Sequence, residues 1–173
     1  MSAPASLARK ACLALVAPGM LLAPAGCSLL DPGDREAKAY VEQMQPIFVQ
    51  NMELTREFVD IATEVKKGEA RPSDIARRFE EKLVPQATAL RDAVAAVHPA
   101  DEELAATHAV LASAWTGRVE VYAELHRAWG EGDLEAFDAA RRRNLKLKGA
   151  EERYLIDVNR WLAEHDRALD PYP

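Results

Sequence analysis

The feature that most restricts how this chain can fold is a heptad repeat between residues 35 and 67. Two interleaved sets of mostly apolar residues recur every seven positions, namely Met44, Asn51, Phe58 and Val65, and Ile47, Leu54 and Ile61. Such a repeat forms one stripe along an α-helix and packs against neighbouring helices. The repeat therefore predicts one long helix that Pro46 kinks and that ends at Gly68.

Three further amphipathic segments are predicted, at residues 74–97, 101–129 and 134–168. Each carries a stripe of apolar residues at helical spacing, and no segment alternates with the period of a strand. The connections between the segments are short, which makes consecutive helices antiparallel. Abundant alanine and an aromatic content of only 6% are also typical of helical cores. The sequence thus predicts an all-α, up-down-up-down four-helix bundle over residues 35–169, followed by an irregular tail at 170–173.

The N-terminus has the layout of a secretory signal peptide. Arg9 and Lys10 are followed by an uncharged run at 11–25, and the run is shorter than the roughly 20 apolar residues of a membrane span. Cys27 follows this run after a single residue, Gly26. The other cysteine, Cys12, lies within it.

Pro24-Ala25-Gly26-Cys27 resembles the lipobox of bacterial lipoprotein precursors, although Pro24 stands where an aliphatic residue is usual. The resemblance covers residues 1–27 and implies cleavage after residue 26 and attachment of acyl chains such as palmitate to Cys27. Two or more acyl chains anchor a protein stably to a bilayer. By the same resemblance, Ser28 implies sorting to the outer membrane, with the domain facing the periplasm, on a tether at 27–34.

Two other interpretations of this segment remain open. Ala23-Pro24-Ala25 also fits the site of an ordinary signal peptidase, which would release a soluble secreted protein with an unpaired thiol. Alternatively, the apolar run is the first buried helix of the fold. Lipidation is favoured because it leaves no free thiol in an oxidising compartment.

The motifs of several catalytic and metal-binding classes are missing from the sequence. No histidine is preceded at three residues by glutamate, as ferritin-type bundles require, and no Gly-x-Ser-x-Gly or Cys-x-x-Cys-His occurs. A haem held by Met44 and His165 is a remote alternative. The net charge of −6 disfavours nucleic acid as a partner, because proteins that bind duplexes usually carry an excess of basic charge. We therefore expect no cofactor and no enzymatic activity.

Polar residues on the inner stripes form the first candidate site. They are Asn51, Gln86, His108, Arg118, Asn144 and Glu151. Polar residues in a helical seam lower stability but fix register, and we favour this structural role. On that interpretation, leucine at position 51 would be tolerated. The alternative is a buried pocket in which the layer binds a small ligand or cofactor.

A basic cluster at the start of the last segment is the second candidate. It comprises Arg141, Arg142, Arg143, Lys146 and Lys148. It could bind an envelope protein or an anionic polymer, but pairs such as Asp138 with Arg142 and Lys148 with Glu152 would also explain it as a solvated face. Taken together, the sequence predicts a membrane-anchored lipoprotein of the cell envelope with a non-catalytic binding or structural module.

Overall fold

The structure is a computed structural model that describes residues 31–69 and 71–171. All of its regular elements are helical: α1 (Pro32–Lys67), α2 (Pro72–Arg78), the π-helical turn η1 (Phe79–Leu83), α3 (Val84–Ala95), α4 (Glu102–Glu131) and α5 (Leu134–Ala163). None of these helices combines the length and the apolar character needed to cross a membrane. The expected signal peptide and Cys27 lie outside the described residues.

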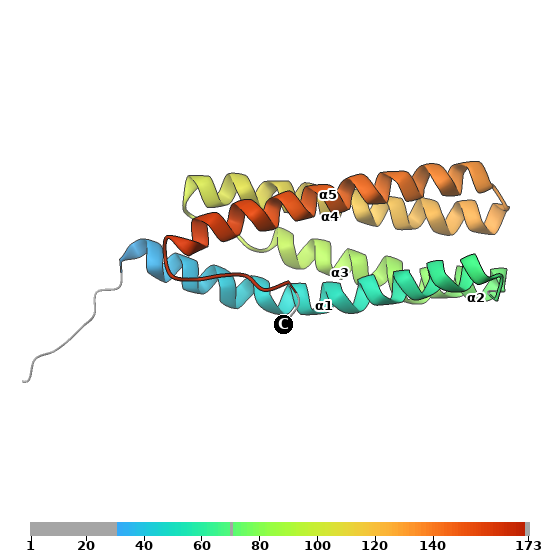
Figure 1. Cartoon of the computed structure of the whole chain (residues 1–173), viewed down its shortest axis with the longest axis horizontal. Helices are drawn as coiled ribbons and strands as arrows, with labels where there is room; N and C mark the ends of the chain where they lie inside the picture. Colours follow the sequence, from blue (N-terminus) through green and yellow to red (C-terminus); the bar gives the residue numbers. More distant parts are fainter. Residues whose placement is uncertain (1–30, 70, 172–173) are drawn as a thin grey trace, which may run out of the picture.

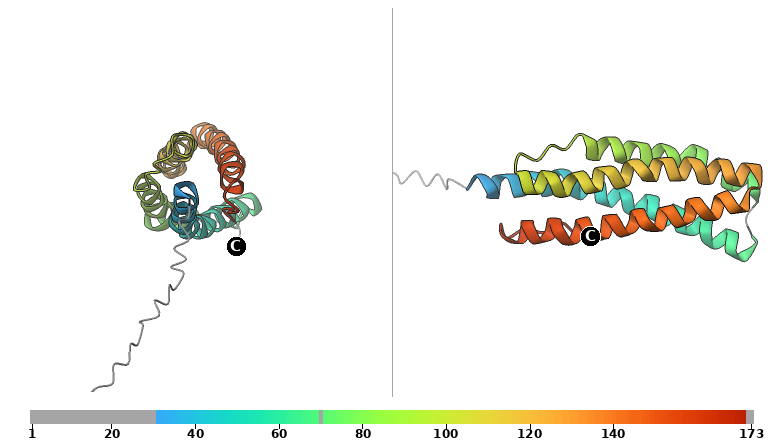
Figure 2. Two further views of the ribbon diagram at one scale, coloured as in Figure 1. Left: turned by 90° about the vertical axis from the view of Figure 1, so that its left-hand side faces the viewer. Right: turned by 90° about the horizontal axis from the view of Figure 1, so that it is seen from above.

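The chain forms the predicted antiparallel four-helix bundle (Figure 1). Helix α1 runs in one direction, α2, η1 and α3 return as one continuous rod, α4 runs back, and α5 returns again. The end-on view in Figure 2 shows the four rods around a common axis. We call the end that contains residue 31 the proximal end, and the end with the turns at Gly68 and Gly132 the distal end.

Helix α1 begins earlier than expected, at Pro32, so residues 32–34 are not part of a tether. Proline is favoured in the first helical turn, where its missing N–H would have no partner in any case. The helix continues through Pro46 as one element. It ends as predicted at Gly68, whose φ of 72° places it in the left-handed region that glycine adopts readily.

The second rod contains a π turn that its sequence pattern does not predict. Pro85 has no N–H to donate to Glu81, and its ring would collide with that carbonyl in a regular helix. The backbone widens instead, and Val84 N–H bonds to the carbonyl of Phe79, five residues back. Each extra residue rotates the following side chains by about 100°. Gln86 is consequently exposed. Ala87 takes the buried position that was predicted for Gln86.

The last two helices start as their sequences predict. The Asp101 carboxylate accepts the N–H of Leu104 at 2.8 Å, and Asp133 accepts that of Ala136 at 2.9 Å. Helix α5 ends at Ala163, however, and not at 168.

The chain after α5 folds back and becomes part of the core. Asp166 has a φ of 53°, and the tail then turns toward α1, as Figure 1 shows. Leu169 is buried, and its backbone N–H and carbonyl bond to the side chain of Asn159 at 2.7 and 3.1 Å. Gln45 on α1 pairs in the same way with the backbone of Asp170. The tail therefore closes the seam between α1 and α5 in the proximal half of the bundle.

Candidate functional site

Three of the predicted polar residues meet at the centre of the bundle. Arg118 on α4 donates from Nη1 to Asn51 Oδ1 on α1 at 2.6 Å and from Nη2 to Glu151 Oε2 on α5. Asn51 Nδ2 in turn donates to Glu151 Oε1 at 2.8 Å. Each residue thus contacts the other two, and the three form a closed triad that joins three helices.

The triad is buried and satisfied from within the protein. Arg118 and Glu151 are 7% and 8% exposed, and the guanidinium lies 5.4 Å from the centre of the Trp115 ring. Ionised side chains are tolerated at such sites only when paired and hydrogen bonded. The carboxylate and the guanidinium neutralise each other, so both can be buried. Because the three side chains bond to one another from three helices, they fix the register of α1, α4 and α5. Its geometry supports the structural role over the ligand pocket.

His108 belongs to a separate chain of hydrogen bonds toward the proximal end. Its Nε2 lies 3.0 Å from the carbonyl of Val94, and its Nδ1 lies 2.9 Å from the Tyr40 hydroxyl. The Tyr40 hydroxyl also lies 2.8 Å from that of Tyr154. A carbonyl only accepts, so Nε2 carries the proton in the neutral ring and Nδ1 accepts from Tyr40. Tyr154 then donates to Tyr40, and the chain is fully ordered.

Burial determines the protonation of this chain. It lowers the pKa of His108, the bond to the Val94 carbonyl opposes that shift, and the charge of His98 adds to it. Burial also raises the pKa of both Tyr40 and Tyr154. The ring is therefore neutral, and both phenols keep their protons near neutral pH. Tyr40 also borders a small proximal pocket of about 230 Å³.

A pH-dependent stability follows from the lowered pKa of His108. The unfolded state binds more protons than the native state between the lowered native pKa and the ordinary value of 6.5. The contribution of His108 is therefore complete above pH 6.5 and is lost as the pH falls below it. Urea titrations at pH 8.0, 6.5 and 5.5 should show this loss, and His108→Gln should flatten it. If the free energy of unfolding depended on pH equally in the wild type and in His108→Gln, His108 would not be the group responsible.

The remaining members of the predicted polar layer do not join the triad. Gln86 is exposed for the reason given above, and Asn144 is only partly buried on α5. Met44 and His165 do not come together as haem ligands. His165 Nδ1 contacts Asp34 at 3.0 Å, and Met44 lies ten residues further along α1, about 15 Å away at 1.5 Å per residue.

The basic cluster lies in the distal half of α5, and much of its charge is paired. Arg143 donates to both carboxylate oxygens of Glu124 at 2.5 and 2.6 Å. Lys148 contacts Glu152 at 4.0 Å, as predicted, whereas Asp138 pairs with Arg141 and not with Arg142. Arg142 and Lys146 are exposed. The cluster is thus mainly a solvated helix face that connects α5 to α4.

A groove that no sequence pattern predicts lies at the distal end, between α1 and α5. It has a volume of about 500 Å³. Its lining is Phe58, Ile61, Ala62, Val65 and Lys66 of α1, Phe79 of η1, Trp129 of α4, and Leu134, Phe137, Asp138 and Arg141 of α5. Aromatic and aliphatic side chains thus make up most of the wall. This is the size and character of pockets that bind small molecules.

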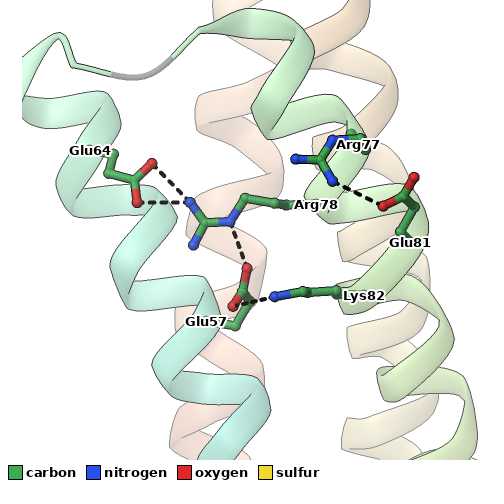
Figure 3. A network of polar contacts seen from close by, with 6 residues as sticks. All are labelled: Glu57, Glu64, Arg77, Arg78, Glu81 and Lys82. Carbon is green, nitrogen blue, oxygen red and sulfur yellow. Dashed lines mark hydrogen bonds and ion pairs between the residues drawn. The ribbon is translucent and has the colours of Figure 1, made fainter.

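A network of ion pairs holds α1 beside this groove (Figure 3). Arg78 donates from Nε to Glu57 at 2.6 Å and from Nη1 to both oxygens of Glu64 at 2.8 Å. Burial opposes ionisation of Glu57, but its bonds and attraction to Arg78 and Lys82 outweigh this effect and lower its pKa. The network ties α1 to the rod of α2 and η1. Among the neighbouring rods, α1 and α5 approach each other least closely, which leaves the groove between them.

Comparisons with known proteins do not assign this fold to a family. No family model matches the chain, and no curated protein or solved structure is significantly similar to it. Within residues 31–69 and 71–171, no group of three or more His, Cys, Asp or Glu side chains could hold a metal ion. The candidate binding surface is therefore defined by its geometry alone.

Proposed function

We propose that this protein is a membrane-anchored lipoprotein of the bacterial cell envelope whose helical bundle is a non-catalytic binding module. The observation that carries the proposal is that the expected lipid anchor and the apolar groove belong to opposite ends of the bundle. The lipobox-like Cys27 precedes α1 by five residues at the proximal end, whereas the apolar groove lies at the distal end. An acylated Cys27 would hold the proximal end at the bilayer and present the groove away from it.

The buried triad supports a binding surface at the groove over one in the polar layer. Asn51, Arg118 and Glu151 direct their polar groups at one another. A guest in that layer would have to replace these bonds. A guest in the groove would instead cover apolar side chains that are already exposed, which is favourable. The basic cluster is a weaker candidate for a protein or anionic-polymer partner because much of its charge is paired.

Lipid attachment is tested by exchanging the two cysteines separately. In a bacterial host fed radiolabelled palmitate, the wild-type chain should carry label and fractionate with the outer membrane. Cys27→Ala should abolish labelling and leave an uncleaved or soluble product. Cys12→Ala is the matched control, since Cys12 lies inside the apolar run, and it should be labelled normally. An unmodified mature N-terminus at Gly26, found by mass spectrometry, would refute the proposal.

A further inference from the structure

The distal groove reaches the hydrophobic core. Ile61 and Phe79 form part of its wall, and both are almost completely buried. Phe58 and Phe137 stand on its two sides. Phe58 stacks on Tyr122 at a ring-centre distance of 5.3 Å, and Phe137 packs at a tilt against Trp129 at 5.4 Å. A guest in the groove would therefore contact aromatic rings that their neighbours already hold in place.

The groove is open because nothing fills the distal part of the seam between α1 and α5. In the proximal part the C-terminal tail supplies Leu169 as a core residue. At the distal end, Leu134 lines the groove and is 72% exposed. An apolar guest that covered Leu134 and the adjoining rings would remove apolar surface from water, as Leu169 of the tail does in the proximal part, and this burial would favour binding.

The charges around the groove favour an anion. Three ionisable residues line it, namely Lys66, Asp138 and Arg141. Arg141 and Asp138 pair with each other at 3.2 Å. Lys66 forms no ion pair with any other residue in the part of the chain that the structure describes. The groove is therefore lined by one net positive charge, on a chain whose overall charge is −6.

The size of the groove favours a hydrocarbon chain over a partner helix. Its walls span residues 58–66 of α1 and 134–141 of α5, each about 11 to 12 Å long at 1.5 Å per residue. A typical helix of 11 to 12 residues is about 17 Å long, so only about two of its turns would lie within the groove. The groove offers about 500 Å³. It can enclose a small molecule but only part of a helix.

We propose that the distal groove binds a single-chain anionic amphiphile of the fatty-acid class, with its hydrocarbon chain between α1 and α5 and its carboxylate at Lys66. This inference rests on the proposed binding function and specifies the ligand for it. Apolar walls bind the chain without direction, and the ammonium group of Lys66 orients it by fixing the charged end.

Binding is tested by calorimetry on the full chain carrying Cys27→Ala, which cannot be acylated. The probes are dodecanoate and dodecyltrimethylammonium, which share a chain and differ in charge, each below its micellar concentration. Dodecanoate should bind with one-to-one stoichiometry and at least tenfold more tightly than dodecyltrimethylammonium. Octanoate, decanoate and dodecanoate should differ by up to about fourfold per added methylene while the chain still fits the groove.

Two pairs of variants locate the site. Leu134→Gln should weaken dodecanoate binding at least tenfold, whereas Leu145→Gln should not, although Leu145 is also on α5 and 60% exposed. Lys66→Glu should remove the preference for the anion, whereas Lys67→Glu, one residue further along and not in the lining, should keep it. Retained circular dichroism in all four variants ensures that a loss of binding reflects the groove.

Several outcomes would overturn the ligand assignment. Equal affinity for the two dodecyl probes, or binding unaffected by Leu134→Gln, would indicate nonspecific adsorption. Absence of dodecanoate binding, together with a photo-crosslinker at position 134 that captures an envelope protein in cells, would make the groove a protein-docking surface. In that case the ligand class fails while the proposed binding function survives, since the Cys27→Ala labelling experiment is independent of the groove.

Discussion

Replacing Arg118 with methionine should lower the free energy of unfolding by about 3 to 5 kcal/mol. The substitution keeps much of the apolar stem but leaves the Glu151 carboxylate buried without its cationic partner. Glu151 is 8% exposed and keeps only the bond from Asn51 Nδ2. An ionised group with so little solvation is costly in a protein interior. The loss is measurable by urea unfolding, followed by circular dichroism at neutral pH.

The matched control removes the whole triad. Asn51→Leu, Arg118→Met and Glu151→Leu together should recover most of the lost stability, because an apolar layer of similar volume contains no unpaired charge. A triple variant as unstable as Arg118→Met alone would show that packing, and not electrostatics, causes the loss.

Asn51→Leu alone should now lower stability by about 1 to 3 kcal/mol, the usual range for unsatisfied buried partners. The sequence suggested that this substitution would be tolerated. In the structure it would remove an acceptor from Arg118 and a donor from Glu151. A variant that melts like the wild type would show that these two residues compensate by binding each other more closely.

Replacing Phe48 with alanine should lower the free energy of unfolding by a similar 3 to 5 kcal/mol. Phe48 is completely buried, and its ring lies 5.7 Å from Trp115 and 6.1 Å from Tyr154, between α1, α4 and α5. Truncation leaves a cavity in a region where three helices meet and none can move inward without disturbing the other contacts. Urea unfolding measures the effect, followed by the fluorescence of the three tryptophans, one of which is Trp115.

Phe58→Ala is the comparison for Phe48→Ala. The heptad pattern includes Phe58 and not Phe48, yet Phe58 is only partly buried and already borders the distal groove. Its removal enlarges an existing groove and exposes little new surface, so the loss should be clearly smaller than at Phe48. A larger loss at Phe58 would mean that its stacking on Tyr122 is central to the core.

Local sequence patterns predict the helices of this fold. The heptad spacing from Met44 to Val65 predicts α1 and its buried stripe. The predicted end at Gly68 and the predicted starts at 101 and 134 lie within one residue of the helix ends in the structure. These signals are readable because helix periodicity and capping depend on residues within about one turn of each other. The four-helix count and the antiparallel order follow from the same information and the short connections.

The burial of individual polar residues was predictable only where the helix stays regular. Asn51, His108, Arg118 and Glu151 lie inside, as their stripes indicate. Gln86 does not, because the π turn before Pro85 shifts the phase of the second rod by one residue. Proline signals a disturbance at this point, but whether a helix bends or widens there depends on the helices packed against it.

The partners of these residues were decided by tertiary structure. The sequence placed His108 and Arg118 in one layer, whereas the structure joins Arg118 to Asn51 and Glu151, and His108 to Tyr40 and Tyr154. Pairing across helices depends on their axial offset and rotation, which no single-helix pattern contains. The same holds for the tail, where Leu169 fills the proximal seam, and for the distal groove that remains because no residue fills the other half. The sequence alone therefore determined the helices and their inward faces, and packing between them determined both the closed polar triad and the open apolar groove.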